Sequence, residues 1–454
     1  MRPAPHAGTS ILLSIPDGTF NRLTGPSKRW NQKHTAPAVG GIFFPQRTKL
    51  GFDARELTPG LVAKIVYAGG DARSEKRAQI SLDKVGGVTV SVKTIERVLH
   101  DVGSEMKALR DCAPSRLPGS LVPPPPAAPP KLAVVMVDGG RMMTRQPGNG
   151  SGVHQQAWRE TKNASFESMT HHTFDVDPQP EIPACFNDPK HVAEIVGTAA
   201  LNVQTSDVGK KKSTRDDDMS PRPVRLVRTC LSSLVSASLF GVQMNREARR
   251  RCFSKSAAKA FLGDGLAWNW TLWKKHFSTF EPILDFMHAV EYVYSAAVVM
   301  HAGKDAAAWA CYMRWAQQCW SGDVGKVLSE LLAWLKSKKI DPVATLDDKH
   351  KGKAVHDAHR YLTNNTSRMD YARYRTAGLP VTSAPMESLV KQVNLRVKGT
   401  EMFWNDAEKG GESILQIRAA ILSEDGRLDT FLDNRPGSPF VRKASANAYN
   451  TLKS

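Results

Sequence analysis

Four consecutive prolines at 123–126, followed by Pro129 and Pro130, constrain this chain more than any other feature of its sequence. Proline fixes φ and has no amide donor, so neither a helix nor a central strand passes through such a run. The run instead favours an extended, semi-rigid polyproline spacer. We therefore predict a Pro-rich linker over 114–131, which divides the chain into an N-terminal and a C-terminal part.

The charge of the chain is strongly positive, with 62 Lys and Arg against 44 Asp and Glu and a formal net charge of +18. This excess indicates a polyanionic partner and argues against an acidic metabolite. Its six cysteines form no Cys-x-x-Cys pair, which argues against a disulfide framework or a zinc ribbon. No apolar run approaches the ~18–20 residues of a membrane span, so we expect a cytoplasmic protein with no membrane partner.

The N-terminal part contains a pattern typical of a helix-turn-helix. A helical stretch is followed by a glycine-containing turn and then by Ser91, a good N-cap. Apolar residues recur at helical spacing from Ile95 to Val102, and Gly103 is the expected stop. A helix, a tight turn and a second short helix make up the DNA-binding plan.

The second helix would expose a basic and polar face that suits a DNA groove. We expect the DNA-binding residues there to be Lys93, Thr94, Arg97 and His100. The alternative is a plain helical pair with a solvated basic face.

The C-terminal part opens on a continuous apolar run, 132–137, which ends at Asp138-Gly139. Such a run is typical of a strand buried on both faces. Residues 146–220 are mostly polar and aperiodic, and we expect an irregular insertion there. A helical pattern returns over about 241–262, and 289–375 reads as helical throughout.

Together these patterns predict an α/β protein with seven segments. They are a flexible basic arm (1–41), a helix-turn-helix domain (42–113), the Pro-rich linker (114–131), the first part of a core (132–288, including the irregular insertion 146–220), a helical insertion domain (289–380), the last part of the core (381–434) and a tail (435–454).

Three acidic residues fall at the ends of ordered elements. Asp138 closes the buried strand, Asp264 closes a shorter segment, and Glu387 lies in the first turn of a helix. Carboxylates at the carboxyl edge of a sheet are well placed to build a site. Carboxylate oxygens suit Mg²⁺ or Mn²⁺, and a pair of such ions promotes phosphoryl transfer. In a basic chain, three converging carboxylates therefore indicate chemistry on a nucleic-acid backbone.

The helix that carries Glu387 has two neighbouring stripes. An apolar stripe at i, i+4, i+7 and i+11 would pack on the core, and it consists of Met386, Val390, Val393 and Val397. One position further on, Glu387 is followed at the same spacing by three expected phosphate contacts, Lys391, Asn394 and Lys398. The alternative for Glu387 is a first-turn acid favoured by the helix macrodipole.

Four motifs occur in a recognisable order. They are Val137-Asp138-Gly139-Gly140-Arg141, Phe261-Leu262-Gly263-Asp264-Gly265, Ile283-Leu284-Asp285-Phe286-Met287-His288-Ala289 and Pro385-Met386-Glu387-Ser388. This ordered set resembles the DDE transposases of bacterial insertion sequences, in the Mutator-like branch and most like the Kra-type group.

The resemblance implies an RNase H-like catalytic core in which Asp138, Asp264 and Glu387 are the catalytic, metal-binding acids. Asp285 and His288 resemble the Asp-x-x-His motif that follows the second acid in this branch, and we expect them to support the site. Asp285 is the alternative second acid because it also ends an apolar run. Asp264 is preferred because its flanking glycines allow the backbone to approach a metal–phosphate site closely.

The predicted function is a DNA transposase that cuts and joins insertion-sequence ends with two Mg²⁺ (or Mn²⁺) ions. Its expected partners are double-stranded DNA, as terminal inverted repeats and target, and further copies of the chain in a homodimer or larger assembly. We expect a nucleoid-associated protein of the bacterial cytoplasm. The alternatives are a non-catalytic DNA-binding regulator derived from a decayed transposase, and a Mg²⁺-dependent nuclease.

Overall fold

The computed structural model describes residues 56–112, 119–145, 158–203, 222–399, 403–404 and 410–435. It also describes the backbone of two paired short strands, β1 (His34–Thr35) and β2 (Ile42–Phe43). Apart from these strands and Arg435, the predicted basic arm and the predicted tail lie outside the described residues.

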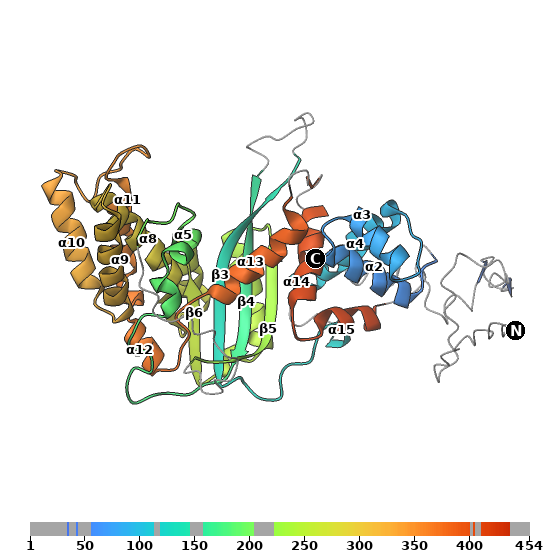
Figure 1. Ribbon diagram of the computed structural model, residues 1–454. Coiled ribbons are helices and arrows are strands. Elements are labelled where there is room, and N and C mark those ends of the chain that lie inside the picture. Colours follow the sequence, from blue (N-terminus) through green and yellow to red (C-terminus); the bar gives the residue numbers. More distant parts are fainter. Residues whose placement is uncertain are drawn as a thin grey trace, which may run out of the picture.

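A five-stranded mixed sheet forms the centre of the molecule (Figure 1). Its spatial order is β5-β4-β3-β6-β7, in which β3 pairs antiparallel with β4 and parallel with β6. The strands are β3 (Leu132–Met143), β4 (Trp158–Met169), β5 (Arg225–Ser233), β6 (Ala258–Gly263) and β7 (Glu281–Leu284). Helices cover this sheet, so the predicted α/β class is confirmed.

Strand β3 is buried along residues 132–137 because helices pack on both faces of the sheet. Ala133, Val135 and Val137 share one core cluster with apolar side chains of helix α6 (Ala237–Arg250) and helix α7 (Ala267–His276). Leu132, Val134 and Met136 belong to the other cluster, with helices α13 (Ala384–Val397) and α14 (Glu412–Leu422). The continuous apolar run thus has the two-sided burial that it predicts.

The expectation of an irregular insertion over 146–220 is wrong for β4, which pairs with β3 along its full length. One face of β4 is polar yet buried, with Asn163, Ser165 and Glu167 inaccessible to solvent. Partners on neighbouring positions satisfy this face in part, since Ser232 donates to Asn163 at 2.7 Å and Ser165 to Glu167 at 3.0 Å. A buried polar strand lacks the apolar alternation by which strands are predicted. The same stretch also contains η5 (Ala184–Asn187) and α5 (Pro189–Val196).

The helical pattern predicted over about 241–262 ends earlier in the structure, at Arg250 in α6. A short turn, η6 (Phe253–Lys255), separates it from β6, whose Phe261 and Leu262 are completely buried. A short apolar run is compatible with either a helix or a strand, and parallel pairing with β3 decides for the strand here.

Three helices precede the sheet: α2 (Pro59–Asp71), α3 (Glu75–Lys84) and α4 (Val92–Asp111). The predicted N-cap is confirmed, because the amide of Thr94 donates to Ser91 Oγ at 3.0 Å. Gly103 does not stop α4, so that expectation is wrong. A Cβ on Gly103 would lie 2.4 Å from the Ser413 carbonyl oxygen, so this glycine permits close packing of α4 against α14.

A second group of helices lies between β7 and α13, at the opposite side of the sheet from α2–α4 (Figure 1). It comprises α8 (Phe286–Met300), α9 (Asp305–Trp320), α10 (Val324–Ser337), α11 (Lys353–Asn365), η7 (Thr366–Arg368) and α12 (Tyr371–Thr376). Large aromatic residues such as Trp315 and Trp320 are buried within this group.

The proline run has neither helix nor strand, and it connects η3 (Gly119–Leu121) to the start of β3. The last helix, α15 (Arg427–Asn434), packs beside η3 and α14. Within the described part of the chain, no helix has the length and apolar character needed to cross a membrane.

Candidate carboxylate site

Asp138 and Asp264 come together because their strands are neighbours. Strands β3 and β6 are parallel, with Val137 paired to Gly263, so the two aspartates follow registered residues at the same edge of the sheet. Strand β3 continues beyond this point because it forms a long antiparallel pair with β4, and Asp138 Oδ1 accepts a hydrogen bond from the Gly139 amide at 2.6 Å. Both carboxylates are partly buried.

The turn that carries Asp264 is held by two other elements. Its Oδ1 accepts from the Leu266 amide at 2.9 Å and from the side-chain amide of Asn269 in α7. Its main-chain carbonyl accepts from the Tyr361 hydroxyl at 2.6 Å, which links the turn to α11. Gly265 has a φ of +91°, and a Cβ there would lie 2.6 Å from the Tyr361 ring. Glycine is therefore required by both conformation and space.

Asp285 connects the end of β7 to the start of the helix that carries Glu387. Its two oxygens accept from the amide and the hydroxyl of Ser383, each at 2.8 Å, and Asp285 also caps α8 through the Met287 amide. Glu387 follows in the first turn of α13 and keeps 25% of its side chain exposed. Asp285 is completely buried, so its oxygens serve this junction.

His288 lies between two acids one helical turn apart in α8. Its Nε2 is 3.8 Å from Asp285 Oδ2, and its Nδ1 is 3.3 Å from Glu291 Oε2. Burial lowers the pKa of His288, but the bond to Glu291 and the charges of Asp285, Glu291 and Asp264 outweigh it and raise the pKa to about 10. At neutral pH the side chain is therefore an imidazolium cation, which donates hydrogen bonds and is no metal ligand.

The carboxylates influence one another electrostatically. Burial is the main cause that raises the pKa of Asp138 to about 7, followed by the negative charge of Asp264. Glu387 raises it further, while His288 and the Gly139 amide act in the opposite direction. Burial also raises the pKa of Asp264 and of Glu387. The predicted acids thus form one negatively charged group with a single buried histidine cation among them.

The donor set of this group fits a hard divalent cation. It consists of carboxylate oxygens alone, and the raised pKa values indicate that their negative charges lack compensation. Within the described residues, no three His, Cys, Asp or Glu side chains approach closely enough to enclose an ion as they stand. Asp138, Asp264 and Glu387 are therefore the residues that would hold Mg²⁺ or Mn²⁺.

The predicted phosphate contacts on α13 are placed differently from one another. The apolar stripe packs on the core as predicted, since Met386, Val390, Val393 and Val397 are all buried. Lys391 is exposed, and Lys398 Nζ lies 5.7 Å from the centre of the Trp158 ring. The Asn394 Oδ1 atom instead is buried and faces Gly140 of β3.

The predicted DNA-reading residues lie on α4, away from the carboxylates. Lys93, Arg97 and His100 are exposed, and Lys93 forms an ion pair with Glu96 at 2.9 Å. Thr94 is half-buried, and its Oγ1 lies 2.9 Å from Ser91 Oγ. In Figure 1 α4 lies beyond α14, at some remove from β6 and β7.

Several residues of the site are not among the predicted ones. Asn269 and Glu291 lie one turn from predicted residues on the same helices, so helical spacing alone was enough to identify them. Tyr361 is distant in sequence from Asp264, to which it is bonded, and no local pattern indicates that contact. Ser383 was likewise identifiable only once β7 and α13 were known to be adjacent.

The chain matches no protein-family model, and no curated protein is similar enough to it to count as a match. The chemistry of the carboxylate group therefore carries the functional inference.

Proposed function

We propose that this protein is a DNA transposase that cuts and joins DNA ends by metal-dependent phosphoryl transfer. The observation that carries the proposal is the convergence of Asp138, Asp264 and Glu387 in a chain with a net charge of +18. A basic protein attracts a polyanion, and grouped carboxylates suit the ions that act on phosphate esters.

The order and direction of the strands support an RNase H-like core. The first three strands form an antiparallel meander, and the last two strands add in parallel on the other side of β3. In such a core the first acid lies on the first strand, the second follows the fourth strand, and the third lies on a later helix. Asp138, Asp264 and Glu387 occupy the corresponding positions in chain order.

The helices α2, α3 and α4 support a DNA-reading role for the N-terminal part. Helix α4 follows α3 after a short turn and presents Lys93, Arg97 and His100 to solvent. A helix-turn-helix places the corresponding side chains of its second helix in the major groove. We propose that these residues contact the terminal repeats, in an assembly of at least two copies.

Each side chain of the carboxylate group then has a distinct task. Asp138, Asp264 and Glu387 would hold two Mg²⁺ ions, which supply an activated oxygen nucleophile and stabilise the leaving 3′ oxygen when bound. Asn269 and the Leu266 amide orient the Asp264 carboxylate. Asp285 aligns the start of α13 through Ser383, and the His288 cation offsets part of the negative charge.

Cations paired with tryptophan rings flank the site and fit a nucleic-acid partner. Lys162 Nζ lies 6.0 Å from the centre of the Trp268 ring, and the Arg368 guanidinium lies 4.4 Å from that of Trp270. Lysine and arginine bind phosphates, while aromatic rings stack on unpaired bases. These residues are candidates for gripping the DNA end beside the carboxylates.

Strand cleavage and strand transfer, measured with and without Mg²⁺ on DNA that carries the sequences flanking the gene, test the proposal. We expect Asp138→Asn, Asp264→Asn and Glu387→Gln each to lose at least about 100-fold in cleavage, because each removes charge stabilisation at the reacting phosphate. DNA binding should remain.

The control is Asp348→Asn, which changes a carboxylate that is 97% exposed and should leave activity unchanged. Cleavage without joining would instead indicate a nuclease. Mg²⁺-independent DNA binding without cleavage would indicate a regulator, and normal cleavage in any one of the three variants would remove that residue from the site.

A further inference from the structure

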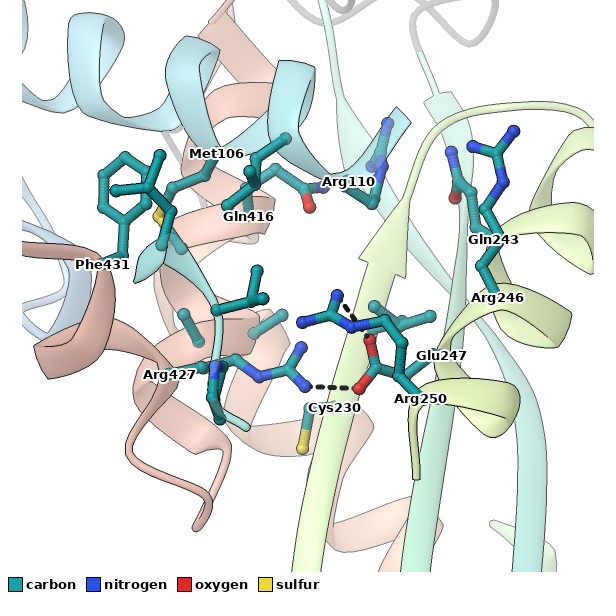
Figure 2. Close-up of a pocket in the computed structure, with 17 residues that line it drawn as sticks. Met106, Arg110, Cys230, Gln243, Arg246, Glu247, Arg250, Gln416, Arg427 and Phe431 are labelled. Atoms are coloured by element: carbon teal, nitrogen blue, oxygen red, sulfur yellow. Dashed lines mark hydrogen bonds and ion pairs between the residues drawn. The ribbon is translucent and has the colours of Figure 1, made fainter. Parts of the chain in front are cut away.

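A cavity separate from the carboxylates lies where α4, β5, α6, α14 and α15 meet (Figure 2). It has room for about 70 Å³, enough for a few water molecules at the ~10–15 Å³ that each needs. Its floor is apolar, with Leu121, Cys230 and Phe431 among the lining side chains. Arginine side chains of α6 and α15 form its polar wall.

The positive charge of this wall exceeds what its acid can neutralise. Glu247 is the one acidic residue among the described residues that line the cavity, and it is 4% exposed. Its Oε1 already accepts from Arg427 at 2.7 Å and from Arg251 at 2.8 Å. Arg250 reaches only the other oxygen, at 3.6 Å, which is longer than a hydrogen bond.

Two guanidiniums are therefore short of acceptors within the described part of the chain. Arg250 makes no hydrogen bond there, and Arg246 makes one, to the Asp111 carbonyl at 3.0 Å. The two arginines are four residues apart on α6, so they share one face, where like charges repel each other. Burial and the nearby charge of Arg427 both lower the pKa of Arg250, as expected where positive charges crowd together.

An unpaired acceptor lies on the same face one turn earlier. The side chain of Gln243 is 6% exposed and lines the cavity, and its Nε2 donates to Asp111 at 3.0 Å. Its Oε1 is buried and has no hydrogen-bond partner among the residues described. A ligand that matches this wall must bring negative oxygens for Arg246 and Arg250 and an O–H group for Gln243.

We propose that this cavity binds a phosphate-sized oxyanion, held by Arg246 and Arg250, whose O–H group donates to Gln243. Guanidiniums pair with phosphate oxygens through parallel N–H donors, and a protonated phosphate supplies the O–H group. The small volume suits the ion or a single phosphoryl group. The proposal does not depend on the carboxylate chemistry.

The position of the cavity gives such binding a structural consequence. Its walls come from α4 in the N-terminal helices, from β5 and α6 in the sheet layer, and from α14 and α15 near the end of the chain. An anion bound there would connect all three parts, and it would stabilise the folded state because the unfolded chain lacks the site.

Thermal unfolding and calorimetric titration of the full chain with inorganic phosphate, against chloride at equal ionic strength, test the proposal. We expect phosphate to raise the melting temperature of the wild-type chain. Arg246→Gln and Arg250→Gln should each weaken phosphate binding at least tenfold. Arg249→Gln is the matched control, because Arg249 is exposed on the same helix and does not line the cavity.

The proposal is overturned if phosphate does not stabilise the wild-type chain, or if it stabilises a folded Arg250→Gln variant equally. A variant that fails to fold is replaced by Gln243→Leu, which keeps the arginines and should still weaken binding.

DNA-binding measurements on the same variants identify the source of the anion once phosphate binding is established. A loss of DNA affinity in Arg250→Gln but not in Arg249→Gln supports a phosphate of the DNA backbone. Unchanged DNA affinity supports a free anion. Because the phosphate titration contains no DNA, its result stands apart from that of the cleavage assay.

Discussion

His288 illustrates how a single buried cation supports a group of acids. It contacts Asp285 and Glu291, and its raised pKa of about 10 keeps it charged at neutral pH. We expect His288→Ala to lower cleavage about 10- to 100-fold, the usual scale for a partner that orients ligands, without abolishing it. Cleavage rates and DNA binding should be measured together. His301→Ala, at the other end of α8, is the control, and complete loss of activity would give His288 a larger role than support.

Glu247 predicts how stability depends on pH. Burial alone would raise the pKa of Glu247, but Arg427, Arg251 and Arg250 outweigh it and hold the pKa well below its usual range. The folded state therefore gains stability above the ordinary glutamate pKa of about 4.3, and that gain is lost as the pH falls toward the depressed value.

We expect Glu247→Gln to lower the free energy of unfolding at pH 7 by about 3–5 kcal/mol, because it leaves buried guanidiniums without their partner. Urea unfolding at pH 7 and pH 3 measures this, and the difference from the wild-type chain should shrink at pH 3. Glu330→Gln, which removes an exposed partner of Arg314, should change stability by less than about 1 kcal/mol. A pH-independent difference would contradict the assignment.

At the scale of elements, the contact between α4 and α14 depends on the absence of a side chain at Gly103. A methyl group there would meet the main-chain oxygen of Ser413, which cannot move aside as a flexible side chain can. We expect Gly103→Ala to destabilise the fold by at least about 1–3 kcal/mol in urea unfolding, the cost of overpacking a closely packed contact.

Gly60→Ala is the matched control in the first turn of α2, because no atom lies within 4 Å of the added Cβ. Alanine should be neutral or stabilising there by up to about 1 kcal/mol. Equal effects at the two glycines would show that helix propensity, and not the packing of α4 on α14, controls the response.

At the scale of the whole molecule, two buried arginines tie the N-terminal helices to the layer that carries Glu387. Arg396, at the end of α13, donates to the Gly69 carbonyl at 2.7 Å and to Glu75 at 2.6 Å. Arg418 of α14 donates to the Gln392 carbonyl at 3.1 Å and pairs with Asp71. Side chains of α2, α4, α13 and α14 also share one apolar cluster.

This shared core predicts that α2–α4 and the sheet unfold together. Hydrogen exchange along a urea series should give amides of α4 and β3 the same free energy of opening, because neither layer retains its core without the other. Arg396→Ala should lower both values together. Exchange of α4 at much lower urea than β3 would contradict this and would indicate an independently folding N-terminal unit.

Local chemistry was enough to predict the elements whose signals lie within a few residues. The run ending at Asp138 predicts a doubly covered strand because continuous apolar character has no other stable environment in a soluble protein. Ser91 predicts a helix start through its own hydroxyl, and the stripe from Met386 to Val397 predicts the buried face of α13. The three acids of the proposed site follow from their positions at the ends of such elements.

Tertiary structure alone decided the features whose energies come from distant partners. Strand β4 is buried despite its polar residues because Ser232 pairs with Asn163 across the sheet. Gly103 lies inside a helix because α14 packs against it, and the turn at Asp264 is held by Tyr361 from α11. A hydrogen bond or a close contact needs both of its atoms in place, and only the folded chain brings residues so far apart in sequence within reach of each other.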